Sequence, residues 1–208
     1  MTIKPGAPWG REVERPDGLV TVDSDRSLVV ALAEPDGPPV AVGAGDLART
    51  LGVTSPEHGV ENRATLSEFP IDLLAVRLDE ATEPVMACAH VIARSPWTRG
   101  HWFRGPILAV MNVEFVGEWD IAPRGHPNDG RVEVFDVDAS MTVRDRLAAR
   151  RRLPNATHLP HPRIATRSVR SATWSFPRPL EVVVDGRRLG RATTLTIDVV
   201  PDTAVVYA

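Results

Sequence analysis

A short glycine-containing segment near the start of the chain has the residue types of an anion-binding loop. Gly43 and Gly45 precede Asp46, the expected start of a short helix that includes Arg49. Backbone N–H groups at a helix N-terminus attract anions, and a guanidinium pairs with phosphate oxygens. The segment is therefore a candidate phosphate site. A plain strand–turn–helix junction also explains the same residues and is the favoured interpretation.

A second candidate anion site lies in the expected helix at residues 143–152, which holds five arginines and one acidic residue. This helix is either a solvated surface helix or a positive patch for anionic lipid headgroups or a phosphate-rich partner. The candidate anion ligands in it are Arg150, Arg151 and Arg152. The side chains expected to face inward are Val143, Leu147 and Ala148.

Other chemistries have less support in the sequence. His158 and His161 alternate with prolines that extend the chain, and no Cys or acidic residue follows at ligand spacing, so loop histidines are favoured over a zinc site. Cys88 lies in an apolar run and is expected to be buried. The isoelectric point near 6.1 disfavours nucleic acid as a partner. No Gly-x-Ser-x-Gly motif of a serine hydrolase is present.

The relation of the chain to a membrane depends on one aromatic loop. Trp97, Trp102 and Phe103 either dip into a membrane interface or cover a lipid cleft, or they pack at the edge of the core. The first residues have no apolar stretch to form a signal sequence, and no apolar run reaches 18 residues. We therefore expect a cytoplasmic protein that is at most peripheral to a membrane.

The elements that would position these residues are mainly strands, because many short apolar runs are separated by 19 prolines and 15 glycines. Asp185 and Gly186 lie between two β-branched runs and predict a hairpin. The expected strands are residues 19–22, 28–32, 40–42, 71–78, 85–93, 107–113, 131–137, 164–172, 180–184, 193–199 and 204–207. The expected fold is a two-layer antiparallel β-sandwich with a small N-terminal α/β remnant and few short helices.

The order of residues between positions 107 and 137 resembles a known family. A strand expected to be buried on both faces leads to Asn112 and Gly117, then Ala122-Pro123 and the turn Asp129-Gly130. This order is similar to that in the C-terminal domain of bacterial diacylglycerol kinases and related lipid kinases. The resemblance extends over roughly residues 40–206.

Two departures from the family pattern bear on catalysis. Asp185 and Gly186 match a Val-Asp-Gly-Glu segment at the catalytic cleft, but Arg187 stands where the family has Glu. An arginine cannot accept a proton at neutral pH. The Gly-Gly-Asp-Gly-Thr loop that holds nucleotide phosphates in the family is absent from the sequence. The resemblance implies cleft positions for Asn112, Asp185 and Arg187.

The resemblance also implies a metal site and a domain division. The Asp of the family's Asp-Gly turn lies near Mg²⁺, which makes Asp129 a candidate metal ligand. A turn held by Asx contacts is the alternative interpretation of Asn128-Asp129-Gly130. Residues 1–55 are expected to form a truncated N-terminal segment packed on a lipid-kinase-like domain at residues 56–208.

Three functional hypotheses follow from the sequence. The first is a lipid-kinase-like protein, catalytically incomplete, that binds a lipid, a phosphorylated small molecule or a partner. The second is an active kinase that phosphorylates a lipid hydroxyl with ATP, with a separate nucleotide-binding subunit where needed. The third is a homodimeric scaffold without a ligand.

Overall fold

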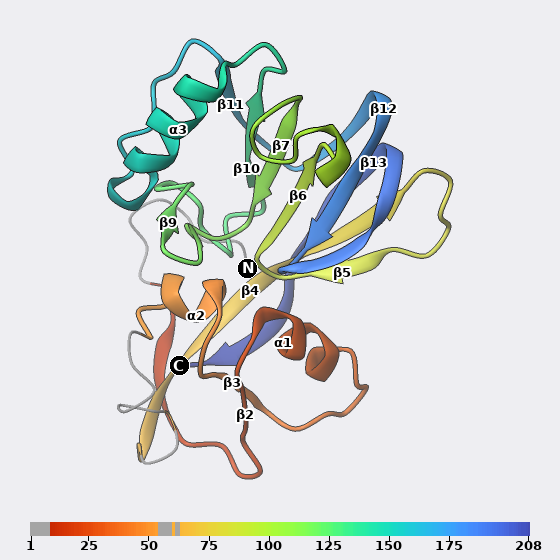
Figure 1. The fold of residues 1–208 in the computed structure, drawn as a ribbon. Coiled ribbons are helices and arrows are strands. Elements are labelled where there is room, and N and C mark those ends of the chain that lie inside the picture. Colours follow the sequence, from red (N-terminus) through yellow and green to blue (C-terminus); the bar gives the residue numbers. More distant parts are fainter. Residues whose placement is uncertain (1–8, 54–59, 61–62) are drawn as a thin grey trace.

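The structure is a computed structural model that describes residues 9–53, 60 and 63–208. Strands account for 46% of the structure, and helices are few and short (Figure 1). The strands are β1 (Arg11–Glu14), β2 (Val20–Val22), β3 (Val40–Val42), β4 (Thr65–Leu78), β5 (Val85–Ala87), β6 (His90–Arg94), β7 (Ile107–Met111), β8 (Phe115–Val116), β9 (Trp119–Asp120), β10 (Val132–Val137), β11 (Ile164–Val169), β12 (Ser171–Val184) and β13 (Arg187–Tyr207). The helices are α1 (Asp25–Leu32), α2 (Asp46–Thr50), η3 (Trp97–Arg99), α3 (Val143–Arg152) and η4 (Leu153–Asn155).

Eleven of the strands belong to one hydrogen-bonded sheet. Its main path runs β1-β4-β13-β12-β6-β7-β10-β11, with β2, β3 and β5 attached beside it, and β8 and β9 form a separate hairpin. Every pair along the main path is antiparallel. The expectation of a mainly β, antiparallel fold with few short helices is confirmed. Hydrogen bonds connect these eleven strands into one continuous sheet.

The core lies on both faces of the central strands. In β7, Leu108 and Val110 pack into one apolar cluster, whereas Ala109 and Met111 pack into the other. Successive side chains of a strand point to opposite faces, and both faces are covered here. The prediction that this strand is buried on both sides is therefore confirmed. The first cluster is formed by the strands alone, and the second also includes side chains from α1 and α2.

The first helix replaces a strand that the sequence predicted. Residues 28–32 belong to α1, not to a strand, so that prediction is wrong. The Ser24 hydroxyl accepts a hydrogen bond from the Ser27 N–H at 3.2 Å, and Asp25 occupies the first turn. A serine N-cap and an acidic first turn are the usual start of a helix. This local signal decides the structure of the apolar run that follows.

Helix α3 occupies the predicted residues, but a different face is buried. Val143 is 39% exposed and Ala148 is exposed, so their predicted inward orientation is wrong. Leu147 is 40% exposed but still lines the space between α3 and the sheet. Arg146 is buried instead, at 7% exposed. The guanidinium of Arg146 donates hydrogen bonds to four backbone carbonyls, which satisfy it inside the protein.

The predicted turn between β12 and β13 is confirmed. Asp185 and Gly186 have φ angles of 44° and 74°, which fits the two positive φ values of a type I′ hairpin turn. Among the described residues, no helix is both long enough and apolar enough to cross a membrane.

Candidate functional site

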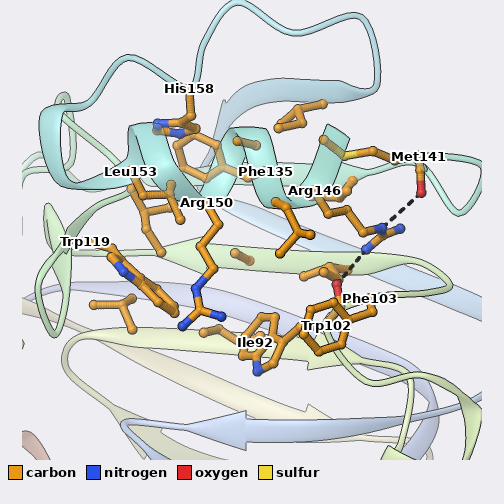
Figure 2. A pocket seen from close by; sticks show the side chains of 18 residues that line it. Ile92, Trp102, Phe103, Trp119, Phe135, Met141, Arg146, Arg150, Leu153 and His158 are labelled. Atoms are coloured by element: carbon orange, nitrogen blue, oxygen red, sulfur yellow. Dashed lines mark hydrogen bonds between the residues drawn. The ribbon is translucent and has the colours of Figure 1, made fainter. Parts of the chain in front are cut away.

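An apolar cavity of about 220 Å³ lies between the sheet and α3 (Figure 2). Its walls come from β6, β7, β10, α3 and the β8–β9 hairpin, together with the loops that join them. The lining side chains are Ile92, Trp102, Phe103, Ile107, Ala109, Val116, Trp119, Ile121, Phe135, Val137, Met141, Arg146, Leu147, Ala149, Arg150, Leu153, His158 and Ile164. An engineered apolar cavity of about 150 Å³ binds benzene, so this one has room for an apolar group of at least that size.

The strand register explains why the sheet is hollow at this point. Ala109 of β7 is paired with Ile92 of β6 on one side and with Phe135 of β10 on the other. These three side chains lie in a row across the sheet and face the cavity. The small side chain of Ala109 between two large ones leaves space above the middle strand. Sequence reasoning missed this floor, because the row exists only once the strands are paired in register.

Arg146 fixes the roof of the cavity. Its guanidinium donates to the carbonyl oxygens of Met141, Trp102, Gly105 and Asp138, at N–O distances of 3.0, 3.2, 2.5 and 3.2 Å. These bonds connect α3 to the loop that carries Trp102 and Phe103 (Figure 2). The guanidinium therefore has a structural role in the cavity wall.

Three exposed side chains mark where the cavity meets solvent: Phe103, Leu147 and Arg150. Arg150 extends from α3 across the cavity, and its guanidinium carbon lies 5.2 Å from the centre of the Trp119 ring (Figure 2). A cation over an aromatic face in this range is weakly attracted to it. The guanidinium of Arg150 thus lies at the mouth of an otherwise apolar cavity.

His158 is a buried residue of the cavity lining. The residue is 3% exposed, and neither ring nitrogen has a hydrogen-bond partner among the described residues. Burial lowers the pKa of His158, and the nearby Asp120 carboxylate opposes that shift. The imidazole is therefore neutral at neutral pH. The surroundings of His158 do not support a zinc site, which the sequence also disfavoured.

The predicted anion loop is occupied by the protein's own groups. The Asp25 carboxylate accepts hydrogen bonds from the N–H groups of Asp46 and Leu47, at 2.8 and 3.0 Å. Gly45 adopts a φ of 117°, and a Cβ there would lie 2.6 Å from Asp25 Oδ1. A Cβ at Gly43 would lie 2.9 Å from Cγ2 of Thr21 in β2, so this position is crowded as well. Asp25, which the sequence did not single out, thus neutralises the N-terminus of α2.

Asp46 and Arg49 hold the β8–β9 hairpin rather than an external anion. The Asp46 carboxylate accepts a hydrogen bond from Gly117 N–H at 2.6 Å, and the Arg49 guanidinium donates to Gly117 O at 2.8 Å. Arg49 also lies over the Phe115 ring, 4.5 Å from its centre. Because this hairpin carries Trp119, the predicted phosphate segment supports the cavity wall.

The predicted cleft residues Asn112 and Asp185 meet around Cys88. The Asp185 carboxylate accepts three backbone hydrogen bonds, from Cys88, Ala89 and His90, at 2.9, 3.0 and 2.9 Å. The Asn112 amide donates to Cys88 O at 2.8 Å and to Asp72 O at 3.0 Å. Cys88 is fully buried, as predicted. The position where the family has Glu holds Arg187, which is exposed.

The residues around Asp129 do not fit the metal site that the resemblance implies. Asp129 accepts a hydrogen bond from the Arg131 N–H at 2.9 Å, as expected for an Asx turn. Burial raises the pKa of Asp129. The neighbouring Asp72 accepts hydrogen bonds from Gly130 and Asp202 N–H groups at 2.7 and 2.8 Å. Within the described ranges, no three His, Cys, Asp or Glu side chains are grouped to hold a metal ion.

The chain was compared with protein families, curated proteins and solved structures, and only solved structures match it. No protein-family model matches the chain, and no curated protein matches it. Three solved structures from Bacillus anthracis str. Sterne are similar to it. One is described as a diacylglycerol kinase, and the other two carry the same description as a provisional assignment. The first has a TM-score of 0.61 and 14% identity, and the match covers 90% of this chain and 75% of that one.

The other two structures each have a TM-score of 0.64, with 13% and 14% identity, and each match covers 90% of this chain and 77% of the other. The agreement extends over nearly the whole chain, although few residues are identical. The resemblance to bacterial diacylglycerol kinases that the sequence indicated is therefore confirmed at the level of the fold: this chain has the fold of those structures.

Proposed function

We propose that the protein binds the hydrocarbon part of a lipid in the cavity beneath α3. The observation that carries this proposal is the cavity itself, which is lined almost entirely by apolar side chains. Transfer of a methylene group from water to such a site stabilises binding by about 0.8 kcal/mol. The similarity of the fold to that of diacylglycerol kinase structures supports a lipid as the ligand.

The cation at the mouth favours a lipid with an anionic headgroup. Arg150 is exposed and lies over Trp119, so its guanidinium is placed to meet a carboxylate or phosphate that stays at the surface. A guanidinium pairs with both groups through two parallel hydrogen bonds. A fatty acid or a phosphorylated lipid thus fits both the cavity and its mouth.

The surroundings of Asp185 favour a binding function over phosphoryl transfer. A general base must have a free oxygen to accept a proton from the acceptor hydroxyl. The carboxylate of Asp185 already accepts three backbone N–H groups, which occupy three of the about four acceptor sites of a carboxylate. Arg187 cannot act as a base in its place. Both residues support a protein that holds its ligand without phosphorylating it.

A matched pair of substitutions on α3 tests ligand binding. Ala149 lines the cavity, whereas the adjacent Ala148 is exposed and does not. We expect Ala149→Phe to weaken binding of decanoate by about tenfold or more, because the ring removes space worth at least two methylene groups. Ala148→Phe is expected to bind as the wild type does. Titration calorimetry measures both affinities.

Two results would contradict the proposal. One is a wild-type protein that does not bind decanoate or a short-chain phosphatidic acid. The other is equal loss of binding in both variants, which would point to a general effect of phenylalanine on α3. Thermal unfolding of each variant shows whether the substitution leaves the fold intact.

A further inference from the structure

The mouth of the cavity lies within a larger apolar surface. Four large apolar side chains at this end of the sheet are exposed, and we call them the mouth surface: Trp97, Phe103, Val143 and Leu147, with exposed fractions of 75%, 39%, 39% and 40%. Phe103 and Leu147 also line the cavity. Phe103 and Leu147 therefore belong both to the cavity lining and to the exposed surface.

Arg146 holds the two parts of the mouth surface in place. Val143 and Leu147 lie one turn apart on α3. The buried guanidinium of Arg146 binds the carbonyls of Trp102 and Gly105 and so fixes the loop that contains Phe103 against the helix. This loop and α3 lie at the same end of the molecule, away from α1 and α2 (Figure 1). The apolar side chains are thus presented on a rigid support.

Arginines accompany the apolar side chains of this surface. Arg104 follows Phe103, Arg144 follows Val143, and Arg151 lies one turn beyond Leu147. All three are exposed, and none of them forms a salt bridge with a described residue. The acidic residue of α3, Asp145, hydrogen-bonds to the N-cap Thr142 instead. The surface thus combines protruding apolar groups with uncompensated positive charge.

We propose that the mouth surface docks on an anionic lipid bilayer, so that a lipid passes between the bilayer and the cavity without crossing water. This inference rests on the proposed lipid-binding function. Tryptophan favours the membrane–water interface, and each arginine near an acidic leaflet contributes about 1 kcal/mol to binding. The opening of an apolar cavity within the surface favours a bilayer, because a bilayer supplies the ligand at the point of contact.

The test is co-sedimentation of the purified chain with phosphatidylcholine vesicles that do or do not contain phosphatidylglycerol. We expect binding to the anionic vesicles and little to the neutral ones, with loss of binding at roughly 1 M salt, where the screening length is about 3 Å. A variant with Arg104→Ser, Arg144→Ser and Arg151→Ser should partition about a hundredfold more weakly. The matched control changes three other exposed arginines to serine: Arg26, Arg170 and Arg191.

The apolar part of the surface has its own variant. Trp97→Ser with Val143→Ser leaves the cavity lining intact and should weaken vesicle binding at unchanged charge. In the wild type, vesicles should shift the tryptophan emission to shorter wavelength, and Trp97→Phe should remove most of that shift. No shift, or equal vesicle binding by the two triple-serine variants, would overturn the inference.

Failure of docking and failure of ligand binding are distinguishable. Ala149→Phe should lose decanoate but keep its affinity for anionic vesicles, because the mouth surface is unchanged. Parallel loss of both would mean that vesicles are held through a lipid in the cavity, which contradicts docking by the surface. Decanoate binding without any vesicle binding would overturn the docking inference and leave the proposed function standing.

Discussion

At the scale of single residues, buried charge decides the shape of the candidate site. Arg146 is 7% exposed, and burial lowers its pKa, although the Asp138 carboxylate opposes that shift. Four backbone carbonyls compensate for the lost hydration. A buried cation is tolerated only when its donors are satisfied in this way. Arg146 is therefore held inside the protein, whereas the other arginines of α3 stay exposed.

Replacing Arg146 should destabilise the protein, because Arg146→Ala removes the guanidinium that donates to four backbone carbonyls and opens the cavity roof. We expect a loss of about 2–4 kcal/mol in the free energy of unfolding. Arg144→Ala, at an exposed position of the same helix, should change it by less than about 0.5 kcal/mol. Urea denaturation measures both. Equal stability of the two variants would contradict the structural role of Arg146.

At the scale of elements, short segments depend on contacts from elsewhere in the chain. The β8–β9 hairpin has two residues in each strand, and an isolated hairpin of that size is not stable in water. Asp46 and Arg49 of α2 hold it, and Asp25 of α1 caps α2 in turn. The cavity wall thus depends on a chain of contacts that begins at α1.

The titration of Asp25 should make stability depend on pH. Burial and the neighbouring Asp185 and Asp46 carboxylates raise the pKa of Asp25 to about 6, although the N–H groups of Asp46 and Leu47 oppose the shift. The folded state therefore binds a proton more tightly than the unfolded state, whose pKa is 3.8. The resulting stabilisation is present below pH 3.8 and is lost as the pH rises through about 6.

The measurement is the free energy of unfolding of the wild type minus that of Asp25→Asn, followed from pH 4 to pH 7. In this difference, the contributions of the titrating groups that both proteins share cancel. We expect it to fall by up to about 3 kcal/mol over that range. A difference that stays constant, or that rises with pH, would show that the hydrogen bonds from Asp46 and Leu47 outweigh burial.

At the scale of the whole molecule, similarity of the fold does not imply the same chemistry. The architecture matches that of diacylglycerol kinase structures over 90% of the chain. The Asp185 carboxylate, by contrast, is used to fix the backbone at residues 88–90. One fold supports many functions, and function depends on the site built upon it.

We therefore expect the purified 208-residue chain to form no phosphatidic acid from diacylglycerol, ATP and Mg²⁺ above a heat-inactivated sample. Radiolabelled ATP with lipid extraction gives the measurement. Formation of phosphatidic acid by the wild type above that background would contradict the proposed function. Lipid binding by the same preparation serves as the positive control.

The sequence by itself determined the features that depend on local residue order. A mostly apolar run indicated β7, alternating polar and apolar residues indicated β10, and Asp185-Gly186 indicated the turn between β12 and β13. The helix at residues 143–152 was also predicted from the sequence. The order of residues from 107 to 137 indicated the family fold. Each of these signals depends on residues that are close together in the sequence, so it can be recognised before the tertiary contacts are known.

Only the tertiary structure decided the candidate site. The hollow above Ala109 requires the register that places it between Ile92 and Phe135. The capping of α2 by Asp25 joins residues 21 positions apart, and the contact of Arg146 with Trp102 joins residues 44 apart. Such contacts depend on how strands pair and on which buried polar groups find partners. The same sequence segment that looked like a phosphate loop therefore became the support of an apolar cavity.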